Sequence, residues 1–412
     1  MDRTRDEERF QVATKKAKQA RQAKQSRTAK RTRTPKTAHS VRTRSARPAP
    51  SPQLAALEPG ATGTVVFLGA GATKSCGGPL TNQILPGMHE RVAASNSGWS
   101  LARLCDFLKQ EFHVDVGMPA EHYPGLPLLM SLIDTAIDRR QAFNERWDLA
   151  ALNELRQEVE FGIYDLLEEQ LQQSPTNSHW LLFDRLFPAG GEAPCVISTN
   201  YDLIADTTLM YLSERRGDGE GGLPDYRCAI ATMMDNGASP RFGTLLKLHG
   251  SLNWLYCKTC RRLQLGASSA KRYVKVMQRL NGPDVQSMFT PDGDPCPTCR
   301  TLLRPLLIAP THLKDYRNPH LSQVWYEAER VLRAARRVVF VGYSLPDDDI
   351  EVVYLLKRSL SRPDVAVTVI EYDADDPDKA ARDHAAGRRY RTLFGDDMDW
   401  HACGLEKWLR KQ

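Results

Sequence analysis

Residues 64–73 of this chain of 412 residues read Thr-Val-Val-Phe-Leu-Gly-Ala-Gly-Ala-Thr. A short, β-rich apolar run that ends in Gly69-Ala70-Gly71 indicates a buried parallel strand entering a glycine turn. Two glycines in such a turn let the backbone approach a pyrophosphate group, and the helix that follows offers unpaired N–H donors. Lys74 stands where the usual dinucleotide fingerprint has its third glycine, so the stretch fits a plain tight turn equally well.

Later segments repeat this pattern of an apolar run that ends in polar residues. Further strands are predicted at 195–198, 245–248, 306–309, 338–341 and 365–370. Helices are predicted over roughly 319–336 and from near Pro346, where Asp347–Asp349 would occupy the first turn. Strands that alternate with helices and end in polar side chains indicate a doubly wound, Rossmann-like α/β fold with a parallel sheet.

Between residues 100 and 173 the apolar residues recur at helical spacing. Leu101, Leu104 and Leu108 begin a pattern that continues along this segment. Such a period is typical of amphipathic helices that bury one face. We therefore expect a helical insertion of at least three helices over about residues 97–185.

Four cysteines form two closely spaced pairs, Cys257-x-x-Cys260 and Cys296-x-x-Cys299. Two such pairs complete a tetrahedral zinc site, and four thiolates leave no open position, so the zinc would be structural. The 35 residues between the pairs exceed the usual spacing of about 15–20, which predicts a hairpin within a zinc module over about 255–303. A redox pair or free thiols are the alternatives. The other five cysteines (76, 105, 195, 228 and 403) lack ligand spacing and are predicted to be buried apolar residues.

Several polar residues stand directly after predicted strands, where α/β sheets place their ligand sites. His249 could act as a general base, because the pKa of histidine lies near neutrality, or it could be a hydrogen-bonded structural residue. Asn200 and Asp202 suit a ligand site but could equally cap the next helix. Ser344 and Glu371 take the same position on later strands. A carboxylate at Glu371 suits a ribose diol, although an ordinary surface acid fits as well.

The net charge of +6 hides an uneven distribution. Residues 1–50 contain 16 lysines and arginines and four acids, whereas the other 362 residues carry 40 basic and 46 acidic side chains. Residues 1–53 also contain few large apolar side chains, so we predict a disordered basic tail, with structure beginning near Leu54. The acidic balance of the rest gives no support to a nucleic-acid groove on the folded domain.

The sequence also excludes some cellular settings. No apolar run approaches the roughly 18 residues of a membrane helix, and no apolar segment of a secretory signal is present. The N-terminus is rich in Arg, Ser and Thr like a transit peptide, but its early acidic cluster argues against one. Nine cysteines in so long a chain do not make a disulfide scaffold, so a reducing, cytoplasmic setting is predicted.

The order of these motifs resembles that of the sirtuin family, and more closely its bacterial sirtuin-like, NAD-cleaving branch. The chain contains Gly-Ala-Gly-x-Thr (69–73), Thr-Asn-Tyr-Asp (199–202), Lys-Leu-His-Gly-Ser (247–251), the two cysteine pairs and Val-Gly-Tyr-Ser-Leu-Pro (341–346). The resemblance covers roughly residues 62–372. It implies that 54–412 form one NAD-binding domain, in which the helical and zinc modules cover the cleft.

The resemblance also implies roles for individual residues. The pyrophosphate of NAD would be held by Gly69, Ala70, Gly71 and Thr73. Asn200 and Asp202 would line the nicotinamide-ribose pocket, and His249 would be the catalytic base.

The adenosine half of NAD would contact Gly342 and Ser344. Glu371 stands where sirtuins usually have an asparagine at the adenine ribose, and the resemblance fixes its role less firmly than the others.

Two departures from the deacylase pattern concern the peptide side of the site. Sirtuin deacylases follow the glycine turn with Gly-Ile-Pro-Asp-Phe-Arg, whereas this chain reads Gly78-Pro79-Leu80-Thr81-Asn82. After the zinc cysteines, deacylases read Arg-Pro and then Phe-Gly-Glu, whereas this chain keeps Arg304-Pro305 and continues with Ala309-Pro310-Thr311. This pattern favours cleavage of NAD with water as the acceptor.

Three functional hypotheses follow. The first is an NAD glycohydrolase that gives nicotinamide and ADP-ribose, and the resemblance links such proteins to bacterial antiviral defence, as homo-oligomers or members of a complex. The second is an NAD-dependent protein deacylase. The third is a non-catalytic sensor of NAD or ADP-ribose, in which residues 1–50 bind nucleic acid or another acidic surface by counterion release. A merely solvated tail is the alternative to that last role.

Overall fold

The computed structural model describes residues 63–93, 101–172, 178–216, 222–232, 241–265, 295–301, 303–308 and 317–411. Three predictions lie outside these residues. They concern the tail at 1–53 with the start of structure near Leu54, the hairpin between the two cysteine pairs, and the segment Ala309-Pro310-Thr311. Within the described ranges, no helix is long and apolar enough to cross a membrane.

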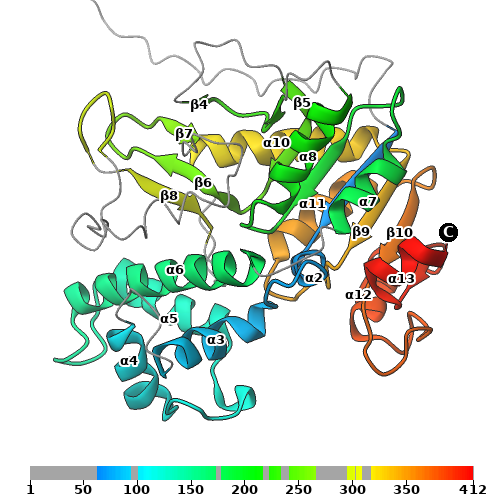
Figure 1. Cartoon of the computed structure of the whole chain (residues 1–412). Helices are drawn as coiled ribbons and strands as arrows, with labels where there is room; N and C mark the ends of the chain where they lie inside the picture. Colours follow the sequence, from blue (N-terminus) through cyan, green and yellow to red (C-terminus); the bar gives the residue numbers. More distant parts are fainter. Residues whose placement is uncertain are drawn as a thin grey trace, which may run out of the picture. The chain divides into compact units, whose positions relative to one another are not determined.

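Seven strands form one parallel sheet (Figure 1). Their order is β11 (Asp399–His401), β10 (Ala366–Ile370), β9 (Arg337–Val341), β1 (Thr64–Leu68), β2 (Cys195–Ser198), β5 (Arg241–Lys247) and β3 (Leu223–Asp225). Every neighbouring pair is parallel. From β1 the chain passes to β2, then to the edge strand β3 and back to β5, before it crosses to β9 on the other side of β1. The predicted doubly wound parallel sheet is confirmed, and its strand order reverses between β1 and β9, where such folds place their ligand sites.

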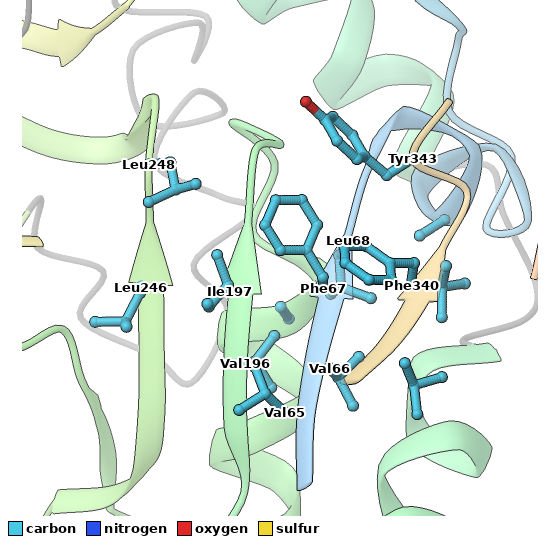
Figure 2. Close-up of a cluster of buried hydrophobic side chains, with 14 of the residues drawn as sticks. Val65, Val66, Phe67, Leu68, Val196, Ile197, Leu246, Leu248, Phe340 and Tyr343 are labelled. Atoms are coloured by element: carbon cyan, nitrogen blue, oxygen red, sulfur yellow. The ribbon is translucent and has the colours of Figure 1, made fainter. Parts of the chain in front are cut away.

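The centre of the sheet is buried along its strands, as near-continuous apolar runs predict. Phe67 of β1 pairs with Ile197 of β2 on one side and with Phe340 of β9 on the other. Figure 2 shows these side chains beside Leu246, with Tyr343 beyond the carboxyl end of β9 and its hydroxyl pointing away from the cluster. The apolar core therefore ends where the predicted polar motifs begin.

Helices cover this sheet. They are α2 (Ala70–Lys74), α7 (Ser178–Leu186), α8 (Ile204–Arg216), α10 (Pro319–Ala334), α11 (Ile350–Leu360), α12 (Ala385–Phe394) and α13 (Gly404–Lys411). Helix α8 packs against α7, whereas α10 packs against α11, and both α8 and α10 contact β5.

The start of α11 corrects one prediction. The acids at 347–349 were expected in the first turn of a helix that begins near Pro346, but α11 begins at Ile350. The N–H of Asp349 donates to the carbonyl of Pro346 at 3.1 Å, so residues 346–349 form a turn before the helix. Asp349 has φ −97° and ψ 46°, outside the helical region, and its side chain accepts from the hydroxyl of Tyr343.

The helical insertion has an apolar core of its own. Its elements are α3 (Thr81–Ala93), α4 (Ala102–Phe112), the short η1 (Ala120–His122), α5 (Leu126–Arg139) and α6 (Leu149–Gln172). This core includes Leu85 of α3, which precedes residue 97. In contrast, Phe183 of α7 belongs to the core of the sheet. The apolar faces thus group α3 to α6, a range shifted toward the N-terminus relative to the predicted 97–185.

A second, four-stranded sheet carries the cysteine pairs. Its order is β4 (Ile230–Thr232), β7 (Leu263–Leu265), β6 (Gly250–Tyr256) and β8 (Arg304–Leu307). Strand β6 follows β5 after only Leu248 and His249, so one short turn connects the large sheet to the small one.

Candidate functional site

The glycine turn after β1 lies against the end of β9. The N–H of Gly69 donates to the carbonyl of Val341 at 3.0 Å, and the N–H of Gly71 donates to that of Gly342 at 2.8 Å. Gly342 has a φ of +58°, and a Cβ there would lie 2.2 Å from the backbone nitrogen of Ala72. These glycines are therefore required by the close approach of two strand ends. Binding of a pyrophosphate by Gly69, Ala70 and Gly71 stays a prediction.

Side chains after β2 are bonded to this glycine turn. The side-chain nitrogen of Asn200 donates to the carbonyl of Gly69 at 2.8 Å. The hydroxyl of Thr73 donates to Oδ2 of Asp202, and Oδ1 of Asp202 accepts from the N–H of Ile204 at 2.9 Å. Three residues predicted for the site, Thr73, Asn200 and Asp202, are thus brought together from positions about 130 apart in the chain. Because both oxygens of Asp202 are engaged, this carboxylate holds the two loops in register.

His249 lies in the turn between β5 and β6 and is only 6% exposed. Its carbonyl accepts from the N–H of Ile308 at 2.8 Å. The ring of Tyr201 lies beside the imidazole, with centroids 6.4 Å apart. The Nε2 atom of His249 lies 3.9 Å from Oδ1 of Asp349, which is close enough for an ion pair when the imidazole is protonated but too long for a hydrogen bond. Sequence reasoning gave Asp349 no part in this site.

A second charged pair lies two residues earlier on β5. Lys247 is 0% exposed, and its Nζ lies 3.2 Å from Oδ2 of Asp206, which is also 0% exposed. The same ammonium group donates to the backbone carbonyl of Asp202, and the hydroxyl of Tyr226 donates to the other oxygen of Asp206. The sequence held a signal for this pair, since a lysine within an apolar strand must find an anion when it is buried.

Ser344 and Glu371 lie at the ends of β9 and β10. Ser344 is exposed, and its carbonyl accepts from Nε and Nη2 of Arg389 at 2.9 and 2.7 Å. Arg389 also lines a cavity of about 300 Å³, together with Pro346 and Ile350. The side chain of Glu371 is buried, which raises its pKa to about 8. Among the described residues its Oε1 has no hydrogen-bond partner, so this oxygen could accept from a ligand hydroxyl.

The four patterned cysteines converge. The Sγ atoms of Cys257, Cys260, Cys296 and Cys299 all lie within 4.8 Å of one another. A zinc ion with Zn–S bonds of about 2.3 Å holds its sulfurs roughly 3.8 Å apart, so this cluster fits a four-thiolate site.

The two cysteine turns have the same shape. The N–H of Cys257 donates to the carbonyl of Arg262 at 2.9 Å, and that of Cys296 donates to the carbonyl of Thr301 at 2.8 Å. Both Arg261 and Arg300 have positive φ angles, of 55° and 67°. The two turns therefore present their sulfurs in equivalent ways.

Among the other five cysteines, Cys76 lies beside a histidine side chain. All nine cysteines lie in the described residues, and none forms a disulfide. Cys76, Cys195 and Cys403 are buried, whereas Cys105 and Cys228 are half-buried. The Sγ atom of Cys76 lies 3.3 Å from Nδ1 of His179. Burial raises the pKa of the Cys76 thiol and lowers that of His179 to about 4, so the two form a neutral pair.

No family model matches the chain, and no curated protein matches it. Among solved structures, the chain is similar to a Sir2 enzyme from work on the mechanism and regulation of these enzymes. The identity is 14% and the TM-score 0.39, over 84% of this chain and 90% of that chain. It is also similar to Sir2Tm bound to a propionylated peptide (13%, TM-score 0.36, 85% and 92% covered). A third similar structure is Sir2 with a p53 peptide and NAD⁺ (14%, TM-score 0.38, 84% and 90% covered).

Proposed function

We propose that this protein cleaves NAD at the bond between nicotinamide and ribose and transfers the ADP-ribosyl group to water. The observation that carries the proposal is the convergence of sirtuin-like motifs at one edge of the sheet. Thr73 and Asn200 are bonded across the ends of β1 and β2, and Gly342 packs on the glycine turn where the strand order reverses. Open α/β sheets bind their ligands at this point.

The chain's own residues supply positioning and a base. The side-chain nitrogen of Asn200 is held by the carbonyl of Gly69, which fixes the direction of its side-chain oxygen. We expect that oxygen to orient the attacking water or a ribose hydroxyl. His249 would accept the proton as the C–N bond to nicotinamide breaks. Burial of His249 limits access of bulk water to this base.

The adenosine half of NAD would lie toward the ends of β9 and β10, near Gly342 and Ser344. Glu371 suits a ribose hydroxyl there, because its buried Oε1 has no hydrogen-bond partner among the described residues. The pyrophosphate would lie at the turn of Gly69, Ala70 and Gly71.

The four cysteines would hold a structural zinc ion. They flank strands β6 and β8 of the small sheet, and four thiolate ligands leave no position for a substrate. The zinc would therefore stabilise this module and take no part in the reaction.

A protein deacylase is the second candidate, and the four-cysteine module favours it. Against it stands the segment after the glycine turn, where Thr81 begins α3 in place of the Phe and Arg of the deacylase pattern. The hydrolase reading therefore stands first.

The wider setting rests on the resemblance alone. We propose a cytoplasmic effector of antiviral defence that works as a homo-oligomer or in a complex. Residues 1–50 would bind nucleic acid or another acidic surface by their charge.

Purified full-length protein incubated with NAD tests the reaction. We expect nicotinamide and ADP-ribose in equal amounts, and a loss of about 10²-fold or more in turnover for His249→Ala and Asn200→Ala, the range typical of a general base. His122→Ala, which changes an exposed histidine, is the matched control. An acetylated peptide in the same assay separates the two candidates. If O-acetyl-ADP-ribose forms in step with deacetylation of the peptide, the protein is a deacylase and the proposed hydrolase function is wrong. Full turnover in both site variants would remove the roles assigned here.

A further inference from the structure

Asp349 is a buried carboxylate that does not serve the helix it precedes. It is the residue before α11, yet its side chain makes no capping hydrogen bond to that helix. It is only 6% exposed. A carboxylate that is removed from water needs partners that compensate for the lost hydration.

One oxygen of Asp349 is held by Tyr343. The tyrosine hydroxyl donates to Oδ2 at 3.0 Å. The ring of Tyr343 packs against Phe67 of β1, with centroids 4.9 Å apart, and its hydroxyl points away from the apolar cluster (Figure 2). The hydroxyl of Tyr390 donates to the backbone carbonyl of Tyr343 at 2.7 Å. The position of the carboxylate is therefore set by the core of the large sheet.

The other oxygen of Asp349 faces His249. The distance from Oδ1 to Nε2 is 3.9 Å, and both side chains are less than one-tenth exposed. Tyr201 lies against the same imidazole from the β2 side, but its hydroxyl donates to the carbonyl of Ile308 at 2.6 Å. Lys247, on the strand before His249, is directed to Asp206. The carboxylate of Asp349 thus lies next to this imidazole, with Oδ1 facing Nε2.

We propose that Asp349 is the positioning residue of His249, whose imidazolium form it stabilises. This inference rests on the proposed function. The attacking O–H bond breaks, its proton passes to a ring nitrogen of His249, and the oxygen electron pair attacks the anomeric carbon as the C–N pair leaves with nicotinamide. The imidazole thereby gains one positive charge, and Asp349 remains ionised beside it. A base oriented and balanced by a third, buried group is a recurrent arrangement in catalysis.

Two substitutions separate charge from shape at this position. Asp349→Asn keeps the size of the side chain and an acceptor for Tyr343 but removes the charge. Asp349→Glu keeps the charge and changes the shape. Asp347→Asn changes an exposed carboxylate in the same turn and is the control.

The first readout is the pKa of His249 itself, from the pH titration of its ring signals by NMR, assigned by their loss in His249→Gln. We expect Asp349→Asn to lower this pKa by about one unit or more, because an opposite charge has been removed. Asp349→Glu and Asp347→Asn should leave it within about half a unit of the wild-type value. The reverse result, a shift in the Glu variant and none in a folded Asn variant, would overturn the proposal.

The second readout is the pH profile of NAD cleavage. A base works when it is deprotonated, so the acidic limb of kcat/KM should move to lower pH in Asp349→Asn, with kcat reduced by at least about tenfold and KM little changed. If NAD is cleaved and the pKa of His249 stays unchanged in this variant, the role of Asp349 is refuted. If the pKa shifts but the wild type cleaves no NAD, the pair stands and the proposed function fails.

Discussion

Lys247 and His249 lie two residues apart, at the end of β5 and in the turn that follows it. Each faces a buried aspartate from a different part of the chain. The Lys247–Asp206 pair is fully buried, with 3.2 Å between nitrogen and oxygen, and its ammonium group also holds the carbonyl of Asp202. The His249–Asp349 pair is slightly exposed, and its atoms lie 3.9 Å apart.

The difference lies in what a proton can do at each pair. A lysine side chain ordinarily carries its charge at neutral pH, and here the ammonium group fixes the loop of Asn200 and Asp202 by donating to the carbonyl of Asp202. Histidine changes its charge near neutral pH, so the second pair can take up a proton during a reaction. One strand end thus carries an ion pair that holds the fold and, in the proposed mechanism, a second pair that takes up a proton during the reaction.

The largest expected effect follows from breaking the permanent pair. Lys247→Met leaves Asp206 as an unpaired buried charge, and we expect the free energy of unfolding to fall by about 3–5 kcal/mol. Urea unfolding measures this loss. Lys407→Met, at an exposed position of α13, should change stability by less than about 0.5 kcal/mol.

The double variant Lys247→Met with Asp206→Asn decides whether the charge is the cause. It removes both charges and keeps an acceptor for Tyr226, so much of the lost stability should return. If Lys247→Met lowers the free energy of unfolding by less than about 1 kcal/mol, the Lys247–Asp206 pair does not hold the fold together as described.

These two pairs also show what the sequence could predict. Apolar runs that end in polar residues were sufficient to predict the parallel sheet, because the length of each run gives the buried part of its strand and the polar residues mark its end. The cysteine spacing was sufficient for the cluster, since all four ligands lie in two local turns. Local patterns therefore located His249 and Asn200 at strand ends.

The partners of these residues could not be predicted in the same way. Asp349 looks like a first-turn acid of α11, and only the packing of Tyr343 on Phe67 brings it to a histidine 100 residues earlier in the chain. Asp206 looks like an ordinary acid in the first turn of α8. Both contacts are set by how strands and helices pack, which no local pattern contains.

A third buried acid extends the comparison, because no cation lies in direct contact with it among the described residues. Burial raises the pKa of Glu371 from 4.5 to about 8, so the folded protein keeps a proton that the unfolded chain releases. The stability that protonated Glu371 contributes is therefore fully present below about pH 4.5 and is lost as the pH rises toward 8. Each pKa unit corresponds to about 1.4 kcal/mol, so the loss amounts to a few kcal/mol.

Glu371→Gln should remove this dependence. We expect its free energy of unfolding to exceed that of the wild type increasingly between pH 5 and 8, as measured by urea unfolding at several pH values. Glu406→Gln, at an exposed position of α13, should follow the wild-type curve. Parallel curves for the wild type and Glu371→Gln would show that the carboxyl is ionised in the folded protein.

The smallest expected effect concerns Cys76 and His179, a buried pair that carries no charge. Burial lowers the pKa of His179 from 6.5 to about 4, so the unfolded chain binds a proton in this range and the folded protein does not. The wild type should therefore lose stability as the pH falls from 6.5 to 4, over fewer pKa units than at Glu371.

His179→Gln should be less stable than the wild type at pH 7 by about 1–2 kcal/mol, because a buried hydrogen-bond partner is lost. Its deficit should shrink on acidification, since glutamine takes up no proton. His122→Gln, at an exposed position, gives the control curve for urea unfolding between pH 7 and 4. A deficit that stays constant over this range would mean that His179 takes up its proton in the folded protein as readily as in the unfolded chain, so that its pair with Cys76 is not kept neutral.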